Sequence, residues 1–190
     1  MRLFVAIVPP PHALAELSAA VEPIRAAAPE LRWAGRESWH LTLAFLGEVD
    51  ELVLPPLTSR LGRAAGRHPD QDLAVAGAGA FPSAARARIL WAGIDADQRG
   101  LAALAASVAA AARRAGAPPP DEGRKYRPHL TLARCRQPEN VSRLTQALAS
   151  FAGTQWTARS IHLIRSHQSS GAPQYEELAG WPLRSSARPG

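Results

Sequence analysis

Two histidine–threonine pairs in this sequence have residue types and a spacing that suit acid–base chemistry. The string His-Leu-Thr-Leu-Ala begins at His40 and again at His129. Both copies lie in apolar stretches, WHLTLAFLG at 39–47 and RPHLTLARC at 127–135, which favour β-strands with one buried face. Alternate side chains of a strand share a face, so each histidine lies beside its threonine while the leucines pack on the other side.

The paired motifs suit cleavage of a phosphodiester, provided that the two strands meet about a pseudo-twofold axis. Attack by water needs a base for the water's proton and an acid for the leaving oxygen, and histidine can serve as either near neutral pH. The hydroxyls of Thr42 and Thr131 can donate hydrogen bonds to the non-bridging oxygens. This scheme uses no metal or cofactor, and the sequence lacks the carboxylate cluster of a two-metal phosphoesterase. By this reasoning His40 and His129 are equivalent, which leaves open which one is the acid.

A structural explanation of the histidines is the simplest alternative. A single His-x-Thr on a strand is a weak motif, and a lone histidine there is usually structural. The two copies, however, stand in matching apolar contexts about half of the 190-residue chain apart. A repeat that only served packing would have no reason to keep a titratable ring at the same phase of both strands.

Composition predicts one globular domain of the cytoplasm. The chain has 190 residues, 46% hydrophobic and 20% charged, and a net charge of +6 carried by 21 arginines and one lysine. The basic excess favours an anionic partner such as nucleic acid or phosphate. The single cysteine, Cys135, excludes an intramolecular disulfide and favours a reducing compartment. No stretch approaches the length of a membrane span or resembles a signal peptide, and nothing in the sequence asks for a dimer.

The hydrophobic pattern predicts interspersed strands and helices in two similar halves, as in an α+β or α/β unit. The link between the halves is expected at about 93–127, where GAPPPDEGRK is rich in turn residues. A single bilobal domain is expected over 1–184 and a flexible tail over 185–190. We expect strands at 3–8, at both repeats and at 72–81, 88–94, 157–166 and 173–178, and helices at 12–27, 50–65, 98–115 and 138–151.

The pair HLTLAFLG and HLTLAR resembles the two HxTx signatures of the two-histidine phosphoesterase superfamily. More closely, the chain is similar to the bacterial RNA 2',3'-cyclic phosphodiesterases, once called 2'-5' RNA ligases. The likeness covers nearly the whole chain, through RLFVAI, RWAGRESWHLTLAFLGEV, FPSAARARILWAGI, KYRPHLTLARC and LIRSHQSSGAPQYEELAGWPL. It implies a bilobal α+β fold in which two antiparallel sheets enclose a central cleft, with the helices on the outside.

The resemblance also implies roles and a reaction. His40 would be the proton donor to the leaving oxygen, His129 the proton acceptor that activates water, and Thr42 and Thr131 the phosphate ligands. The reaction would open a terminal 2',3'-cyclic phosphate of RNA to a 2'-phosphomonoester. Two departures stand out: Tyr126 replaces a common phenylalanine, and the loop at 171–173 is GAP where a tighter Gly-Pro is usual.

Several other residues are candidates for substrate binding. Arg134 follows His129 by five residues, so a regular strand would turn it to the opposite face. It could reach the phosphate only through a bulge or from the end of the strand. Trp33 could stack on a base, although a place in the core or at the rim is the better explanation. The remaining candidates, for stacking or for a basic rim around the phosphate, are Phe45, Phe81, Tyr126, Arg127 and Lys125.

Other functions stay open at this level. The chain could act on another cyclic phosphate, such as a cyclic ADP-ribose phosphate, or reversibly ligate RNA through a 2'-5' linkage. It could be a module that binds RNA or phosphate without catalysis, although arginine or lysine would serve binding alone. His162 could join His40 and His129 in a zinc site, yet no carboxylate or outer partner is apparent. Cys135 is a poor candidate nucleophile because no helix N-terminus activates it.

Overall fold

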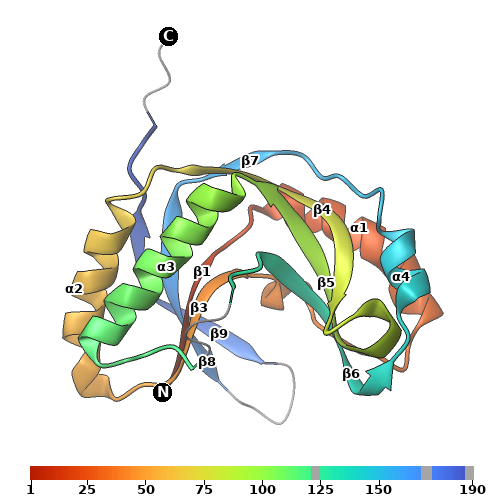
Figure 1. Cartoon of the computed structure of the whole chain (residues 1–190), viewed down its shortest axis with the longest axis horizontal. Coiled ribbons are helices and arrows are strands. Elements are labelled where there is room, and N and C mark those ends of the chain that lie inside the picture. The colour runs from red at the N-terminus through yellow and green to blue at the C-terminus, as the bar shows by residue number, and fades with distance from the viewer. Residues whose placement is uncertain (121–124, 168–172, 187–190) are drawn as a thin grey trace.

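The computed structural model describes residues 1–120, 125–167 and 173–186, which form two antiparallel sheets flanked by helices (Figure 1). The first sheet has the strand order β3 (Leu41–Glu48), β1 (Arg2–Ile7), β8 (Ser160–His167), β9 (Gln174–Pro182). The second has the order β2 (Arg32–Trp33), β6 (His129–Glu139), β5 (Ala87–Ala96), β4 (Gln71–Phe81), β7 (Trp156–Ala158). We call them the β3 sheet and the β6 sheet. The predicted α+β class with two antiparallel sheets is confirmed.

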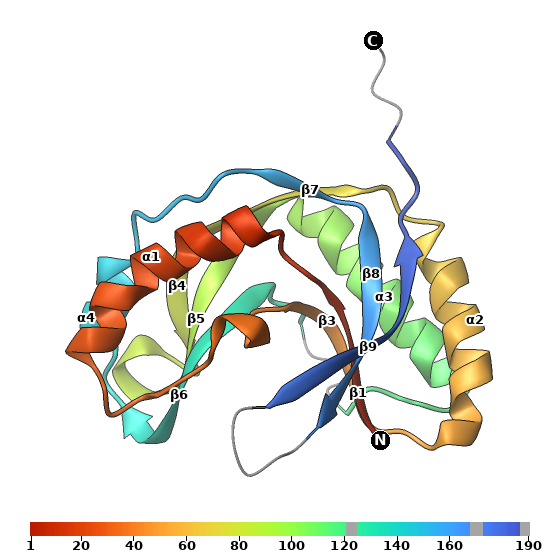
Figure 2. The same ribbon diagram turned by 180° about the vertical axis from the view of Figure 1, so that it is seen from behind.

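Among the described residues, four α-helices lie outside the sheets: α1 (Pro11–Ala27), α2 (Leu54–Ala65), α3 (Gln98–Ala115) and α4 (Ser142–Ala147). Helices α2 and α3 pack together beside the β3 sheet, whereas α1 and α4 lie beside the β6 sheet (Figures 1 and 2). Three short 3-10 helices, η1 (Arg36–Ser38), η2 (Glu51–Val53) and η3 (Ala84–Arg86), lie in the connections. The helices leave the opposite face of each sheet free for the histidines.

The helix ends follow from local sequence. Asp97 accepts a hydrogen bond from the Arg99 amide and caps α3, which ends at Ala115 and is followed by Gly116 with φ of 93°. Asp50, the predicted cap of the second helix, accepts a bond from the Leu52 amide and opens η2 ahead of α2. No helix among the described residues is long and apolar enough to cross a membrane.

The last predicted helix is too long. Strand β6 continues to Glu139, and α4 covers only Ser142–Ala147 of the expected 138–151. The Asn140 side chain accepts a bond from the Ser142 amide and forms the turn between the strand and the helix. The strand predicted at 157–166 is in fact two strands, β7 and β8, which belong to different sheets.

The prediction of two sequential halves is wrong. The β3 sheet combines both ends of the chain, and the β6 sheet takes its strands from 32–33, 71–96 and 129–158. The chain crosses between the sheets at β2, β3, β4 and β8. The prediction missed these crossings because strands pair with distant partners, which a local hydrophobic pattern does not reveal. Of the expected link, 121–124 lie outside the described residues, as do 171–172 of the GAP loop.

One apolar core joins both sheets to the helices. It includes buried residues of each sheet, among them Leu41 and Leu130, together with Leu61 of α2 and Leu104 of α3. The end of the described chain is also tied down, because the Ser186 amide donates a 3.2 Å hydrogen bond to Asp70. The rest of the predicted tail, 187–190, lies outside the described residues.

Candidate active site

The two motif strands share an irregularity directly after the threonine. In β3, Thr42 pairs with Ala6 and Ala44 with Val5, so Leu43 is an extra residue. In β6, Thr131 pairs with Trp91 and Ala133 with Leu90, so Leu132 is extra. Each is a β-bulge that lets two consecutive residues face the core. These residues, Leu43 and Ala44 in β3 and Leu132 and Ala133 in β6, are all buried.

The bulges return the fifth residue after each histidine to the histidine's side of the sheet. These residues are Phe45, which pairs with Phe4, and Arg134, which pairs with Ile89. Phe45 is 46% exposed and Arg134 is exposed as well. Of the two routes that the sequence left open for Arg134, the structure therefore has the bulge. We call the face that carries both histidines, both threonines, Phe45 and Arg134 the site face.

His129 opens β6 and has a fixed ring orientation. Its Nδ1 lies 2.7 Å from the Arg127 carbonyl oxygen. A carbonyl only accepts, so Nδ1 carries the proton and a neutral ring keeps its lone pair on Nε2. The ring also packs edge-on against Phe81 at 5.0 Å and lies 6.1 Å from Trp91. A neutral imidazole held in this way is suited to accept a proton.

The pKa of His129 is lowered from its ordinary value. Burial is the main cause, since it disfavours the charged imidazolium. The bond to the Arg127 carbonyl raises the pKa in part, and the positive charge of Arg134 lowers it further. Arg134 is thus close enough to His129 to act on its charge.

His40 lies immediately before β3 and is held by aromatic packing. Its ring centroid is 5.5 Å from Phe4 and 4.9 Å from Tyr175, the latter in an edge-on arrangement. Burial lowers the pKa of His40, and the neighbouring His162 lowers it further by charge repulsion. No hydrogen bond to another described residue fixes its tautomer, unlike that of His129.

Tyr126 links the two motif strands. It precedes β6, and its hydroxyl donates a 3.1 Å hydrogen bond to the backbone oxygen of Thr42 in β3. Burial raises the pKa of its phenol, which keeps the hydroxyl protonated as a donor. The sequence suggested a ring with an added hydroxyl near the site, and the hydroxyl serves to join one sheet to the other.

The comparisons with known proteins agree with this arrangement. A family model described as the 2'-5' RNA ligase superfamily matches residues 9–170. The chain belongs to this superfamily. The match covers both motifs, so the resemblance inferred from the HxTx signatures is confirmed.

Several relatives are named RNA 2',3'-cyclic phosphodiesterase. The one from Geobacillus stearothermophilus is 32% identical over 153 residues, which are 80% of this chain and 47% of that protein. The one from Thermus thermophilus is 30% identical over 189 residues, covering 97% of this chain and 91% of that protein. The chain thus spans about half the length of the first relative and nearly all of the second. The superfamily is one of enzymes.

Solved structures show the same fold. The crystal structure of TT0787 of Thermus thermophilus matches 97% of this chain and 99% of that one, with a TM-score of 0.76 and 28% identity. Escherichia coli LigT complexed with 3'-AMP matches 96% of this chain and 97% of that one, with a TM-score of 0.74 and 29% identity. The architecture is therefore shared with these two solved structures.

His162 is a third histidine on the site face of this superfamily member. It pairs with Ala6 of β1, whose other partner is Thr42, so His162 and Thr42 flank Ala6. Its Nε2 lies 2.8 Å from the Ser160 hydroxyl, and its Nδ1 lies 2.9 Å from Glu177. The alternation of Ile161, His162 and Leu163 was the only sequence signal for this position. It did not reveal that β8 lies two strands from β3.

The zinc hypothesis needs His40, His129 and His162 together. The described residues contain no group of three or more histidine, cysteine or acidic side chains that could hold a metal ion. Each of these histidines instead has neighbours of its own: aromatic rings for His40, the Arg127 carbonyl for His129 and a serine–glutamate pair for His162. The geometry therefore does not support a shared zinc site.

The remaining candidates divide between the site face and the core. Phe81 contacts His129, and the Arg127 guanidinium lies 5.8 Å from the Phe81 ring. Trp33 faces away, because its indole nitrogen donates to the Ala28 carbonyl at 2.8 Å and Arg25 covers its ring. It is not placed to stack on a base.

Cys135 is buried, and burial raises the pKa of its thiol, which disfavours the nucleophilic thiolate.

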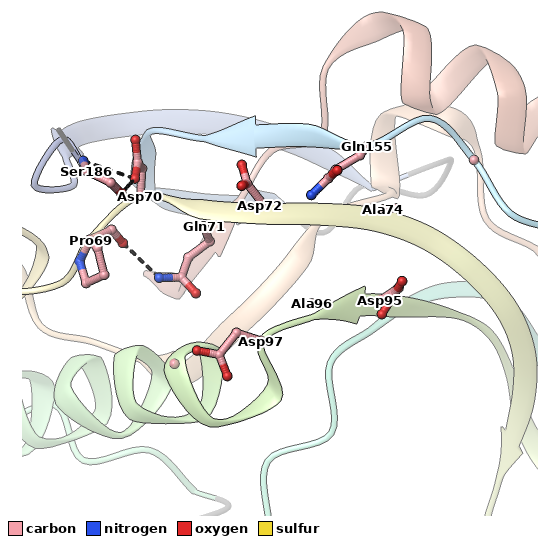
Figure 3. Close-up of a pocket in the computed structure, with 12 residues that line it drawn as sticks. Pro69, Asp70, Gln71, Asp72, Ala74, Asp95, Ala96, Asp97, Gln155 and Ser186 are labelled. Carbon is pink, nitrogen blue, oxygen red and sulfur yellow. Dashed lines mark hydrogen bonds between the residues drawn. The ribbon is translucent and has the colours of Figure 1, made fainter. Parts of the chain in front are cut away.

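A separate cavity of about 600 Å³ lies where β4 begins and β5 ends (Figure 3). Four aspartates line it, which makes it unsuited to a phosphate. Three of them have structural partners: Asp70 binds Ser186, Asp72 accepts from Thr157 at 2.6 Å and Asp97 caps α3. The cavity contains none of the superfamily motif residues.

Proposed function

We propose that the chain hydrolyses terminal 2',3'-cyclic phosphates of RNA to 2'-phosphomonoesters, with His129 as the base and His40 as the acid. The observation that carries this assignment is the bond from His129 Nδ1 to the Arg127 carbonyl, which leaves Nε2 free to accept a proton. The family analogy gave the same roles. Thr42 and Thr131 would hold the non-bridging oxygens from the two sheets.

The reaction would run in one displacement at phosphorus. A water oxygen attacks the phosphorus while its proton passes to His129 Nε2, and the bond from phosphorus to the 3' oxygen breaks. His40 gives its proton to that oxygen, which leaves a 3' hydroxyl and a 2' phosphate. In the free protein burial lowers the pKa of His40, and the negative charge of a bound phosphate would raise it again, so that His40 arrives protonated at the reaction.

Ligase activity follows from the same scheme. If a 5' hydroxyl of a second RNA replaces water, the displaced 3' oxygen again takes the proton of His40 and the product has a 2'-5' linkage. Since the nucleophile is the only difference, the same residues would serve both reactions. Water, present at far higher concentration, favours hydrolysis. Action on other cyclic phosphates and binding without catalysis stay as alternatives, as do the predictions of a monomer and of a cytoplasmic location.

The test compares His40→Ala and His129→Ala with the unchanged protein. Nucleoside 2',3'-cyclic phosphates and an oligonucleotide with a cyclic phosphate end are incubated in EDTA, and 2'- and 3'-phosphate products are resolved. We expect only the 2'-phosphate, and a loss of about a hundredfold or more in each variant. His12→Ala, which changes an exposed histidine on α1, should keep full activity.

Three results would contradict the proposal. A 3'-phosphate product would reverse the direction of opening, and activity that requires added metal would demand a different mechanism. If the protein turns over neither substrate but binds the oligonucleotide, and both alanine variants bind it equally well, the chain is a phosphate-binding module.

A further inference from the structure

Two arginines stand directly opposite each other at the edge of the β6 sheet. Strand β2 pairs with β6 such that Arg32 is the cross-strand partner of Arg134. Direct partners in an antiparallel pair point to the same face, with Cβ atoms about 4.5–5.5 Å apart. The two positive side chains therefore emerge together.

This arginine pair lies on the site face. The next pair of the same ladder, Trp33 with Ala133, points the other way: Ala133 is fully buried, and Trp33 bonds the Ala28 carbonyl. Arg134 also pairs with Ile89 and lowers the pKa of His129 by its charge. The order along β6 on this face is thus His129, Thr131 and then Arg134, with Arg32 beside it.

Nothing in the described structure neutralises the pair. Both side chains are exposed, and neither makes a hydrogen bond or an ion pair with another described residue. Like charges directly opposite in a sheet oppose each other. An anion between the two guanidinium groups would remove this repulsion and accept charge-assisted hydrogen bonds from both.

The position of the pair limits what the anion can be. Thr131 and Arg134 are three residues apart on a strand, which separates their Cα atoms by at most about 10 Å. A phosphate held by Thr42 and Thr131 would therefore have the arginine pair one short step away. In an RNA that ends in a 2',3'-cyclic phosphate, the terminal nucleotide has one further phosphate, on its 5' side.

We propose that Arg32 and Arg134 bind the phosphate on the 5' side of the terminal nucleotide. This inference rests on the proposed function and deepens it, because it makes the preferred substrate an RNA end or a 5'-phosphorylated nucleotide. A nucleoside 2',3'-cyclic phosphate without a 5' phosphate lacks this contact. The second phosphate does not react, so the contact contributes equally to the bound substrate and the transition state and acts mainly on KM.

The test uses two substrates that differ only in the 5' phosphate: a nucleoside 2',3'-cyclic phosphate and its 5'-phosphorylated form. The variants are Arg32→Gln and Arg32→Lys, with Arg88→Gln as the matched control. Arg88 is exposed on β5 and alternates with Ile89, so it points away from the site face.

For Arg32→Gln we expect kcat/KM on the 5'-phosphorylated substrate to fall by about tenfold to a hundredfold, mostly through KM, as for a lost hydrogen bond to a charged group. The loss on the nucleoside substrate should be much smaller. Arg32→Lys should restore part of the preference, because lysine keeps the charge but lacks the planar fork. Arg88→Gln should change neither value.

Equal losses on both substrates, or no loss on either, would overturn the inference. If the unchanged protein turns over neither substrate, binding decides the role of Arg32, and activity on the oligonucleotide with a cyclic phosphate end decides the proposed function separately. Nucleoside 2'-phosphates with and without a 5' phosphate are then titrated against the unchanged protein and Arg32→Gln. The inference survives only if the 5' phosphate strengthens binding and the variant loses that gain. Thermal unfolding of each variant excludes a change in folding as the cause.

Discussion

His40 and His129 occupy corresponding positions in two repeats, yet their rings are held differently. The Arg127 carbonyl fixes the tautomer of His129, whereas His40 contacts the rings of Phe4 and Tyr175 and has no such anchor. A fixed lone pair suits a base that must be ready before the substrate arrives. An acid can instead gain its proton when the negative phosphate binds. The symmetry seen in the sequence is thus broken by the surroundings of each ring.

The fifth residue of each motif breaks the symmetry in a second way. Phe45 presents an exposed ring on the β3 sheet, and Arg134 presents a charge at the matching place on the β6 sheet. A ring suits contact with a base, and a guanidinium suits contact with phosphate. The two sheets therefore offer different chemistry to the two parts of a nucleotide.

Arg134→Gln should raise the pKa of His129. Arg134 lowers that pKa because its positive charge opposes protonation of the imidazole, so removing the charge makes protonation easier. The neutral base is then lost at a higher pH, and the acidic limb of the kcat/KM profile moves to higher pH. The measurement is a titration of the His129 ring by NMR, paired with the pH profile.

Arg88→Gln is again the control, since its side chain points away from the site face. A His129 pKa that stays in place or falls in Arg134→Gln would contradict the charge effect. Activity lost at every pH without a shifted limb would mean that Arg134 acts only through phosphate binding.

At the scale of strands, the packing beneath His129 depends on one glycine. Gly79 of β4 pairs with Trp91 of β5, and a Cβ at Gly79 would overlap the indole ring. Trp91 in turn lies 5.3 Å from Phe81 and 6.1 Å from His129. The absence of a side chain lets the indole lie across the sheet and support the His129 ring.

Gly79→Ala should therefore reduce both stability and activity. The added methyl group has to displace Trp91, and overpacking of this kind costs about 1–3 kcal/mol of unfolding free energy. Denaturant unfolding and kcat/KM are the measurements. Gly66→Ala is the matched control, because that glycine has helical φ of −63° and the nearest atom to a new Cβ is at 3.6 Å. It should be neutral or stabilising. If the two variants behave alike, Gly79 has no special role.

The sequence predicted the phase of the two motif strands well, and for a clear reason. Alternation alone puts a histidine and a threonine on one face and two leucines on the other, and Leu41 and Leu130 are fully buried. The bulges could not be predicted from the Leu-Ala dipeptide that follows each threonine. Both residues are apolar or small, so they fit a bulge with both side chains buried as well as a regular strand with one on each face. The sequence therefore did not determine which face of the sheet carries Arg134, and its pairing with Ile89 does.

Contacts between distant segments account for the other differences. The two-residue strand β2 is too short to leave a hydrophobic pattern, so the pairing of Arg32 with Arg134 had no sequence signal. His162 reaches the site face only because β8 pairs with β1. In this pairing Ala6 lies opposite His162, which follows it by 156 residues in the sequence. These features follow from topology, which local propensities do not determine.

At the scale of the whole molecule, the two sheets are coupled by the path of the chain and by the core. The chain crosses between the sheets several times, and buried residues of both belong to one apolar cluster. The sheets should therefore unfold together as one cooperative unit. On the site face, the two sheets are joined directly by the hydrogen bond from the Tyr126 hydroxyl to the Thr42 carbonyl.

Tyr126→Phe tests that tie because it removes the hydroxyl and keeps the ring. Strand β3 is an edge strand, and loss of a partner for a half-buried carbonyl costs about 1–3 kcal/mol of unfolding free energy. The same change frees Thr42 to move relative to Thr131, so kcat/KM should fall for substrates with and without a 5' phosphate alike. Denaturant unfolding and the two-substrate assay measure these effects.

Tyr175→Phe is the stability control, because Tyr175 contacts Phe4 and His40 through its ring. A Tyr126→Phe variant as stable and as active as the unchanged protein would mean that core packing alone sets the spacing of the two motifs.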